Sequence, residues 1–180
     1  SPAVWGTLGV AGVVAFGTGT FIYVNTTVWN TFRTSSEQTD LRAEYEKTYE
    51  RYATKPQPRI DAADLNIDLY PDRRDARLAG TYVLVNDQST AVDTVFIDTP
   101  ADANVDRLSF GRAAETVRRD ETYGVRLVDL AEPLAPGDST SLTFETWVRN
   151  DGFTSGGRQT SIVHNGTFID SGELPRIGYD

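Results

Sequence analysis

The fold is decided by residues 65–85, which read LNIDLYPDRRDARLAGTYVLV. Apolar side chains occupy alternate positions on both sides of the Pro71–Asp75 segment: Leu65, Ile67 and Leu69 before it, and Leu78, Tyr82 and Leu84 after it. Alternation with a period of two is typical of a strand with one buried face, and a Pro-Asp cluster is typical of a turn. The stretch therefore predicts an antiparallel hairpin.

Five further segments continue the strand pattern: 92–97, 104–110, 115–119, 123–130 and 139–149. The turn Leu134–Asp138 separates the last two, and the Gly and Ser residues of Asn150–Gly157 predict a mobile loop. No helical pattern interrupts the series. Residues 59–180 are therefore predicted to be a mainly β domain, either an antiparallel β-sandwich or an open, saddle-like curved sheet.

Charge is absent from the first 32 residues, since Arg33 is the first charged side chain. As a helix, the apolar and small residues of Val4–Val24 would reach about 30 Å, the thickness of a hydrocarbon core. Aromatic residues flank this stretch, as they do at the headgroup level of a membrane: Trp5 on one side, and Phe21, Tyr23, Trp29 and Phe32 on the other. We expect residues 1–32 to be a transmembrane anchor and its exit, with residues 4–24 in the lipid bilayer.

Two alternatives remain open for this stretch: a secretory signal peptide and a buried helix or strand of a soluble protein. A basic region and a small-x-small cleavage site are missing, and the apolar run is longer than the roughly 7–15 residues usual in signal peptides. These features favour the anchor.

A second, amphipathic helix is predicted to begin at residues 34–36. Thr34 with Glu37, or Ser35 with Gln38, has the spacing of a capping box. Apolar residues then follow at helical spacing: Leu41, Tyr45, Tyr49 and Tyr52. We expect this tyrosine stripe to pack the helix onto the β-domain or onto a partner. The alternative, that the tyrosines form a surface on which a ligand stacks, is less favoured. Pro56 and Pro58 end the helix, so that residues 33–58 form a helix and a Pro linker.

The composition excludes several classes of function. The chain has no Cys, no Met, one His and a net charge of −9. Disulfides and thiolate metal sites are impossible, and a nucleic-acid partner is not expected because no basic face is available. A single imidazole also argues against zinc hydrolases and against Ser or Cys triads.

Short patterns that imitate chemical sites have plainer explanations. Asp102–Asp106 imitates the start of a calcium loop, but Arg107 and Ala113 stand where Gly and Glu are required. His164 lacks a nucleophile elbow that would pair it with Ser155 or Ser161. Asn165-Gly166 is best explained as a turn. The remaining carboxylates are expected to be solvated: Asp61, Asp64, Asp68, Asp72 and Asp75. No catalytic, cofactor-binding or metal-binding residue, and no cofactor, is therefore expected.

Six short phrases carry a resemblance to a known family: YVNTTVWN (23–30), LNIDLYP (65–71), GTYVLVN (80–86), LAPGDS (134–139), NGTF (165–168) and PRIGYD (175–180). They resemble the extracytoplasmic region of bacterial membrane proteins that join an ABC-2-type transporter permease to an aminopeptidase N-like part. The resemblance extends over nearly the whole chain. It implies that residues 59–180 are similar to the non-catalytic N-terminal β-domain of the aminopeptidase N fold.

The resemblance has limits that bear on activity. The family's zinc motif, His-Glu-x-x-His, and its Gly-x-Met-Glu-Asn substrate motif do not occur in these residues. The resemblance therefore transfers no catalytic residue to any position of this sequence, and this chain is not expected to be an enzyme. A longer protein that contains it would be a metallopeptidase if the two motifs follow Asp180.

The expected function is that of a structural and interaction module beside a peptidase-like domain of the same polypeptide. The resemblance implies a place in the bacterial inner membrane, with residues 33–180 extracytoplasmic, on the periplasmic side. It also implies that 164–168 and 174–180 contact the catalytic domain, which requires Phe168 or Ile177 to be exposed. Otherwise the apolar tail completes the domain's own core. The alternative function is an independent anchored, immunoglobulin-like module that binds a protein or a glycan.

Overall fold

The computed structural model describes residues 2–29, 32–100, 103–149, 152–153, 162–169 and 171–179. The chain divides into two compact units. The first consists of residues 1–39 and 150–159, and the second of residues 40–149 and 160–180. The predicted loop Asn150–Gly157 lies largely outside the described residues, which include only Gly152 and Phe153 of it.

The first unit is dominated by the helix α1 (Pro2–Tyr23), which continues into the π-helical turn η1 (Val24–Val28). Together they form a helix that is long and apolar enough to cross a membrane, and no α1 residue is buried. Side chains account for the π turn: Asn25 Nδ2 donates to the Phe21 carbonyl at 2.8 Å, and Thr26 Oγ1 donates to the Ile22 carbonyl at 2.9 Å. Because side chains bond these carbonyls, the backbone can widen there.

The predicted amphipathic helix is α2 (Ser35–Tyr49), followed by the 3₁₀ turn η2 (Glu50–Tyr52). The capping box is confirmed. The Thr34 amide donates to Glu37 Oε2 at 2.7 Å, and the Glu37 amide donates to Thr34 Oγ1 at 3.3 Å. These hydrogen bonds from Thr34, the backbone one foremost, lower the pKa of Glu37.

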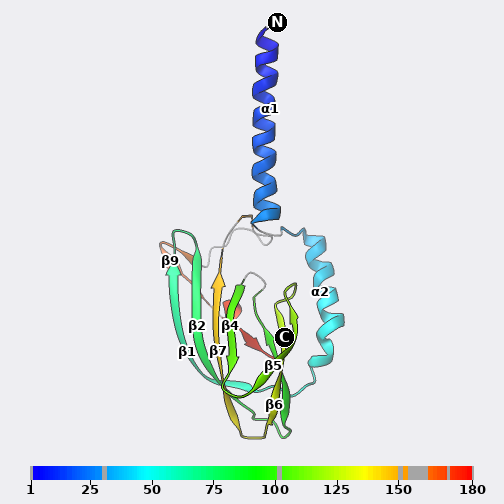
Figure 1. The fold of residues 1–180 in the computed structure, drawn as a ribbon, viewed down its shortest axis with the longest axis vertical. Helices are drawn as coiled ribbons and strands as arrows, with labels where there is room; N and C mark the ends of the chain where they lie inside the picture. The colour runs from blue at the N-terminus through cyan, green and yellow to red at the C-terminus, as the bar shows by residue number, and fades with distance from the viewer. Residues whose placement is uncertain are drawn as a thin grey trace. The chain divides into compact units, whose positions relative to one another are not determined.

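The second unit is mainly β, as predicted, and its strands form two antiparallel four-stranded sheets (Figure 1). Sheet A has the order β1-β2-β7-β4, with β1 (Arg59–Tyr70), β2 (Asp75–Val85), β7 (Ser139–Val148) and β4 (Ala103–Phe110). Sheet B has the order β10-β3-β6-β5, with β10 (Arg176–Ile177), β3 (Val92–Asp98), β6 (Val125–Leu134) and β5 (Ala114–Asp120). The predicted hairpin is the β1–β2 pair.

The core lies between the two sheets, which gives a sandwich-like arrangement. Tyr82 and Leu84 of β2 and Phe144 of β7 are buried against Val95 and Ile97 of β3. Burying such side chains contributes about 1.5–3 kcal/mol each, so this interior supplies the main stabilisation of the domain.

The outer face of sheet B is covered as well, by the tyrosines that follow the helical period. Tyr49 is fully buried against Phe96 of β3 and Leu127 of β6, and Tyr45 and Tyr52 flank it. The Tyr49 and Phe96 rings meet edge to face at 5.8 Å. The prediction that the tyrosine stripe packs the helix onto the domain is confirmed. As a result, three consecutive residues of β3, Val95–Ile97, are buried, so that both faces of the strand are covered there.

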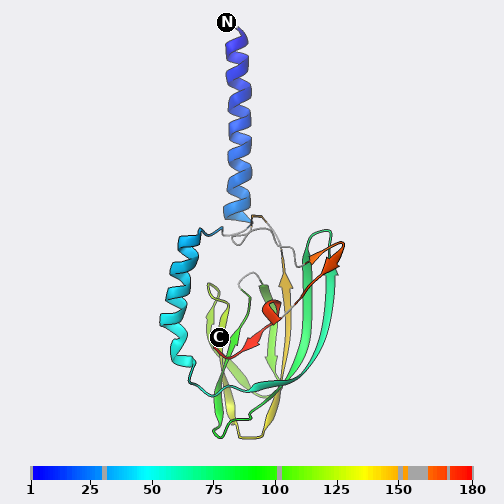
Figure 2. The same cartoon turned by 180° about the vertical axis from the view of Figure 1, so that it is seen from behind.

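The C-terminal segment links the two sheets. It contains the hairpin of β8 (Ile162–Val163) and β9 (Gly166–Thr167), the 3₁₀ turn η3 (Ser171–Glu173) and β10. Ile162 is buried beside Ala76, Leu78 and Val148 of sheet A, whereas β10 pairs with the end of β3. In Figure 2 this segment, orange to red, runs from the β1–β2 hairpin toward sheet B.

Candidate interaction surfaces and a pocket

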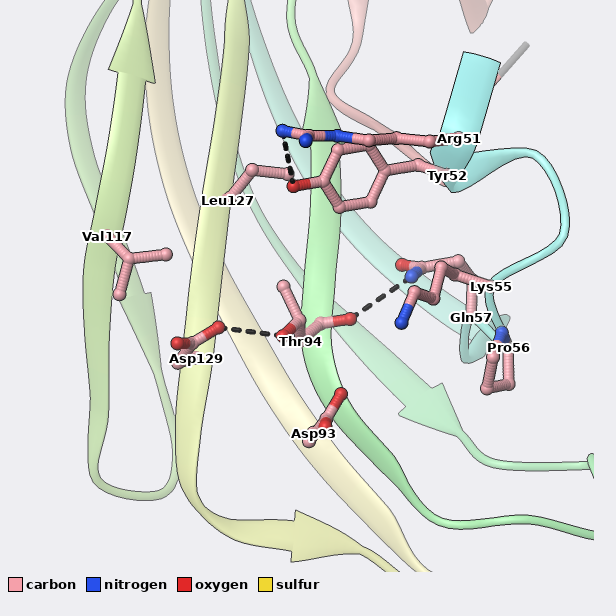
Figure 3. A pocket seen from close by; sticks show the side chains of 10 residues that line it. All are labelled: Arg51, Tyr52, Lys55, Pro56, Gln57, Asp93, Thr94, Val117, Leu127 and Asp129. Atoms are coloured by element: carbon pink, nitrogen blue, oxygen red, sulfur yellow. Dashed lines mark hydrogen bonds between the residues drawn. The ribbon is translucent and has the colours of Figure 1, made fainter. Parts of the chain in front are cut away.

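A pocket lies where η2 and the following linker meet the outer face of sheet B (Figure 3). Its volume is about 480 Å³, and ten residues line it: Arg51, Tyr52, Lys55, Pro56, Gln57, Asp93, Thr94, Val117, Leu127 and Asp129. The two cations, Arg51 and Lys55, come from η2 and the linker, and the two carboxylates from strands β3 and β6. The Arg51 guanidinium lies over the Tyr52 ring, at 5.1 Å from its centroid.

Gln57 forms one wall of this pocket and extends the sheet with its side chain. Its Nε2 donates to the Thr94 carbonyl at 3.1 Å, and its Oε1 accepts from the Phe96 amide at 2.8 Å. The side-chain amide therefore satisfies the same backbone groups that a neighbouring strand would satisfy. The amino-acid sequence gives no sign that Gln57 bonds to a strand, because a lone Gln in a Pro-rich linker carries no periodic signal.

The pocket can bind a polar molecule through its charged rim. Asp129 already accepts a hydrogen bond of 2.7 Å from Thr94 Oγ1, whereas neither Lys55 nor Asp93 forms an ion pair with a described residue. The ten lining residues include no imidazole, and the chain has no thiol. A second hollow of about 470 Å³ shares the linker and adds Gln88, Thr90, Gly178 and Tyr179.

His164 lies in the turn between β8 and β9, largely exposed, and its Nε2 is 2.8 Å from Asp72 Oδ1 in the β1–β2 turn. Ser155 and Ser161, which the sequence offered as partners, lie outside the described residues. The Asn-Gly prediction is confirmed for Asn165, which is in the turn, while Gly166 already begins β9.

The segment that imitates a calcium loop is extended where it is described. Asp102 lies outside the described residues, and Ala103–Arg107 belongs to β4, which pairs with β7. An extended strand cannot wrap its oxygens around one ion. Within the described ranges no group of three or more His, Asp or Glu side chains is placed to hold a metal.

The scattered carboxylates are solvated, with one exception. Asp61, Asp64, Asp68 and Asp72 are exposed, but Asp75 is buried at the start of β2 and forms an ion pair with Arg73 at 3.4 Å. The prediction of a solvated Asp75 was wrong, because this residue begins β2, an inner strand of sheet A, next to the buried Ala76.

The inner face of β1 carries a row of partly exposed apolar side chains, the β1 surface: Leu65, Ile67 and Leu69. Their side of the strand is fixed by their register partners on β2, which are Gly80, Leu78 and Ala76. The last two are buried, yet the three β1 residues are 37–40 % exposed. The alternation of apolar residues predicted this face, but the structure leaves its three side chains partly exposed.

The C-terminal tail contributes a second apolar surface. Phe168 is 70 % exposed, whereas Ile177 is partly buried against the core between the sheets. Ile169 and Leu174 are also partly buried, against sheet A. An interface role for the tail requires Phe168 or Ile177 to be exposed. Phe168 is exposed, and Ile177 is partly buried.

An aromatic pair lies on the outer face of sheet A. The Tyr70 and Trp147 rings are stacked at 5.6 Å, and the guanidinium groups of Arg73 and Arg149 lie 4.9 Å and 5.5 Å from the Tyr70 and Trp147 centroids. Cation–π contacts of this kind occupy ring faces that a sugar would otherwise stack on. This face therefore gives no support to a glycan-binding platform.

Four phenols of the second unit have raised pKa values: those of Tyr45, Tyr49, Tyr82 and Tyr179. Burial raises the pKa of Tyr49 to about 12, and the hydrogen bond to Asp120 acts in the same direction. Burial also raises the pKa of Tyr45 strongly. The pKa of Tyr179 is raised to about 12, mainly because its hydroxyl donates to Glu46. These groups stay neutral near pH 7, as packing residues do, and none is poised for proton transfer there.

Comparison with known proteins adds no identification. No protein-family model matches this chain, and no curated protein matches it.

Proposed function

We propose that this chain is the membrane-anchored β-domain of a larger bacterial membrane protein, and that it serves as a structural and interaction module beside an aminopeptidase-like domain of the same polypeptide. The observation that carries the proposal is α1. This helix of 22 residues bears no charge and buries none of its side chains. Large apolar surfaces without a partner mark membrane or protein contacts.

The length and composition of α1 support insertion over mere surface contact. A helix of about 20 apolar residues is what a hydrocarbon core requires, whereas an interfacial helix has a polar face. The side chains of Val4, Leu8, Val13 and Phe16 point in different directions around the helix, and all are exposed. A helix surrounded by lipid would have apolar side chains exposed on all of its sides, as α1 has.

The bacterial inner membrane and the periplasmic side are proposed from the family resemblance together with the charged second unit. The 32 residues before Arg33 carry no charge, and all acidic and basic side chains follow. In the proposed arrangement, residues 33–180 lie in the extracytoplasmic space.

Contact with a neighbouring domain is supported by the tail. Phe168 stands 70 % exposed directly after β9, so a large aromatic side chain has no partner within the described chain that would bury it. Aromatic side chains of this kind are common anchors of interfaces. We propose a structural role in place of catalysis. The only imidazole of the chain, that of His164, has Asp72 as its single ion-pair partner among the described residues.

The anchor is tested by expressing the chain with and without residues 1–32 and by fractionating the cells. We expect the full chain in the membrane pellet and the shortened chain in the soluble fraction. The variant Val13→Arg should weaken insertion, since a central Arg costs about 2.5–3.5 kcal/mol, whereas Val13→Leu should not. Recovery of the full chain as a soluble monomer without detergent would rule out the anchor.

Docking is tested by placing a photoreactive amino acid at position 168 in the full protein in its native cells. The matched control is position 83, where Val83 of β2 is also apolar and exposed and lines neither described pocket. We expect position 168 to cross-link to an aminopeptidase-like segment of the same polypeptide, identified by mass spectrometry. Equal labelling from both positions, or coding sequence after Asp180 that lacks a peptidase-like part, would contradict the proposal.

A further inference from the structure

Strand β1 is the longest edge of the sandwich. Among the described strands it pairs only with β2, so one row of its backbone N–H and C=O groups has no strand partner. Its register is interrupted between Ile60 and Ala62 and then runs unbroken from Ala62 to Tyr70. Figure 1 shows β1 at the border of sheet A.

The other edges are shorter or irregular. The register of β4 shifts between Val105 and Arg107, that of β5 shifts between Thr116 and Arg118, and β10 has two residues. Bulges and short strands are common means of keeping an edge from pairing with another chain. The regular part of β1 has neither device among the described residues, and its only charged side chains are Asp64 and Asp68.

The two faces of β1 differ in chemistry. The inner face presents Leu65, Ile67 and Leu69, and the outer face presents Asp64, Asn66 and Asp68. Neither Asp64 nor Asp68 forms an ion pair with a described residue. Arg77, the register partner of Asp68, forms its ion pair with Glu145. Within the part of the chain that the structure describes, the edge therefore combines backbone groups without a strand partner, an apolar row and two carboxylates without an ion pair, four residues apart.

A second copy of the chain fits this edge poorly. Antiparallel self-pairing centred on Asn66 would place Asp64 of one copy opposite Asp68 of the other, and like charges directly opposite are destabilising. The net charge of −9 adds to the repulsion. An occupant with positive charge is favoured instead.

We infer that the edge of β1 binds an extended segment of a partner protein, in which apolar residues alternate with polar ones and two Lys or Arg residues stand four apart. The segment adds a strand to sheet A by backbone hydrogen bonds, the mode known as β-augmentation. Its apolar residues cover the β1 surface, and its two cations lie opposite Asp64 and Asp68. This property goes beyond the proposed function, because neither membrane anchoring nor docking through Phe168 requires it.

The probe is a synthetic peptide, acetyl-Val-Lys-Val-Thr-Val-Lys-Val-amide, carrying a fluorescent label. In antiparallel register its two lysines fall opposite Asp64 and Asp68, and its valines fall beside the β1 surface. The control peptide has Glu in place of both Lys. Fluorescence anisotropy is measured with the full chain in non-ionic detergent micelles, with empty micelles as the blank. We expect the Lys peptide to bind and the Glu peptide to bind far more weakly.

Protein variants separate the edge from general charge attraction. The double variant Asp64→Asn/Asp68→Asn should weaken binding of the Lys peptide by roughly two- to thirtyfold, from two cross-strand charge pairs. The matched control is Asp106→Asn, an exposed carboxylate on β4 at the opposite edge of sheet A, which should leave binding unchanged. Equal weakening by both changes would overturn the inference.

Hydrogen exchange tests the backbone contact directly. Binding of the Lys peptide should slow amide exchange within residues 62–70 and leave β4 and β5 unaffected. If the peptide binds without slowing exchange in β1, or if the Glu peptide binds as tightly, the β1 edge is not a strand-binding site. This outcome would leave the membrane anchor and the Phe168 contact untouched, since those are measured by fractionation and cross-linking.

Discussion

The Tyr49 hydroxyl donates a hydrogen bond of 2.6 Å to Asp120 Oδ2, 71 residues further along the chain. The bond joins the end of α2 to the last residue of β5, while the Tyr49 ring is buried against sheet B. The linkage explains why the C-terminal half of a helix with little apolar character of its own is held on the domain.

Tyr49→Phe should lower the free energy of unfolding by about 1.5–3 kcal/mol near pH 7, since it removes a hydrogen bond to a charged group but keeps the ring. The loss is measured as a shift of the urea midpoint of the full chain in detergent. Tyr70→Phe is the matched control, because the Tyr70 hydroxyl has no comparable bond to a carboxylate among the described contacts. Equal shifts for both variants would contradict the assignment.

Alkaline pH should destabilise the domain. A tyrosine in the unfolded chain has a pKa of about 10. In the folded chain the pKa values of Tyr49 and Tyr82 are about 12, and burial is the main cause. Between these values the folded state retains protons that the unfolded state releases, so stability is fully present below pH 10 and falls as the pH rises toward 12. Urea midpoints taken at pH 8 and pH 11 should differ in this direction, and a smaller difference is expected for Tyr49→Phe. An unchanged midpoint at pH 11 would be inconsistent with buried, neutral phenols.

Gly80→Ala should destabilise the β1–β2 pairing. A Cβ at this position would lie 2.6 Å from Leu65 Cδ2, 2.7 Å from the Asp64 carbonyl oxygen and 3.0 Å from Phe144 Cζ. The backbone oxygen cannot move aside cheaply, so we expect a loss of about 1–3 kcal/mol in the free energy of unfolding. Gly166→Ala, whose Cβ would meet no atom within 4 Å, is the control and should be nearly neutral.

Arg126→Met should stabilise the domain. Arg126 is 8 % exposed, its Nη1 has no hydrogen-bond partner, and no described carboxylate forms an ion pair with it. Burial foremost, then the neighbouring Arg119, lowers its pKa. Replacing a buried cation that has no ion pair among the described residues with an apolar side chain of similar length should raise the free energy of unfolding by about 1–3 kcal/mol. Arg107→Met, at an exposed residue of β4 in the other sheet, is the control and should change it little. A destabilised Arg126→Met variant would mean that the guanidinium has a partner.

The strands of the sandwich could be predicted because a two-residue period survives in the sequence wherever one face of a strand is buried. The predicted 92–97 and 104–110 segments became β3 and β4 with shifts of one residue at their ends. The strand predicted at 123–130 was less accurate, since β6 runs from Val125 to Leu134 and includes Pro133. Tertiary pairing of Leu134 with Val92 extends it past the apolar run.

Other features had no sequence signal to carry them. The strands β8, β9 and β10 have two residues each, too few to show a period. The apolar face of β1 was evident from Leu65, Ile67 and Leu69, but its exposure was not, because exposure depends on which strand becomes the edge of the sheet. Strand order is a property of long-range pairing and cannot be derived from local alternation.

The two hydrogen bonds between the Gln57 side chain and β3 bear on how a pulling force along the chain would reach the β-domain. Any tension carried along the chain from α1 reaches residue 57 before it reaches Arg59, the first residue of β1. Because the Gln57 side chain is bonded to Thr94 and Phe96, the load is shared with β3, whose neighbours β6 and β10 hold it on both sides. A pull along the linker would therefore act on β3 of sheet B as well as on β1 of sheet A, before it could peel β1 from β2.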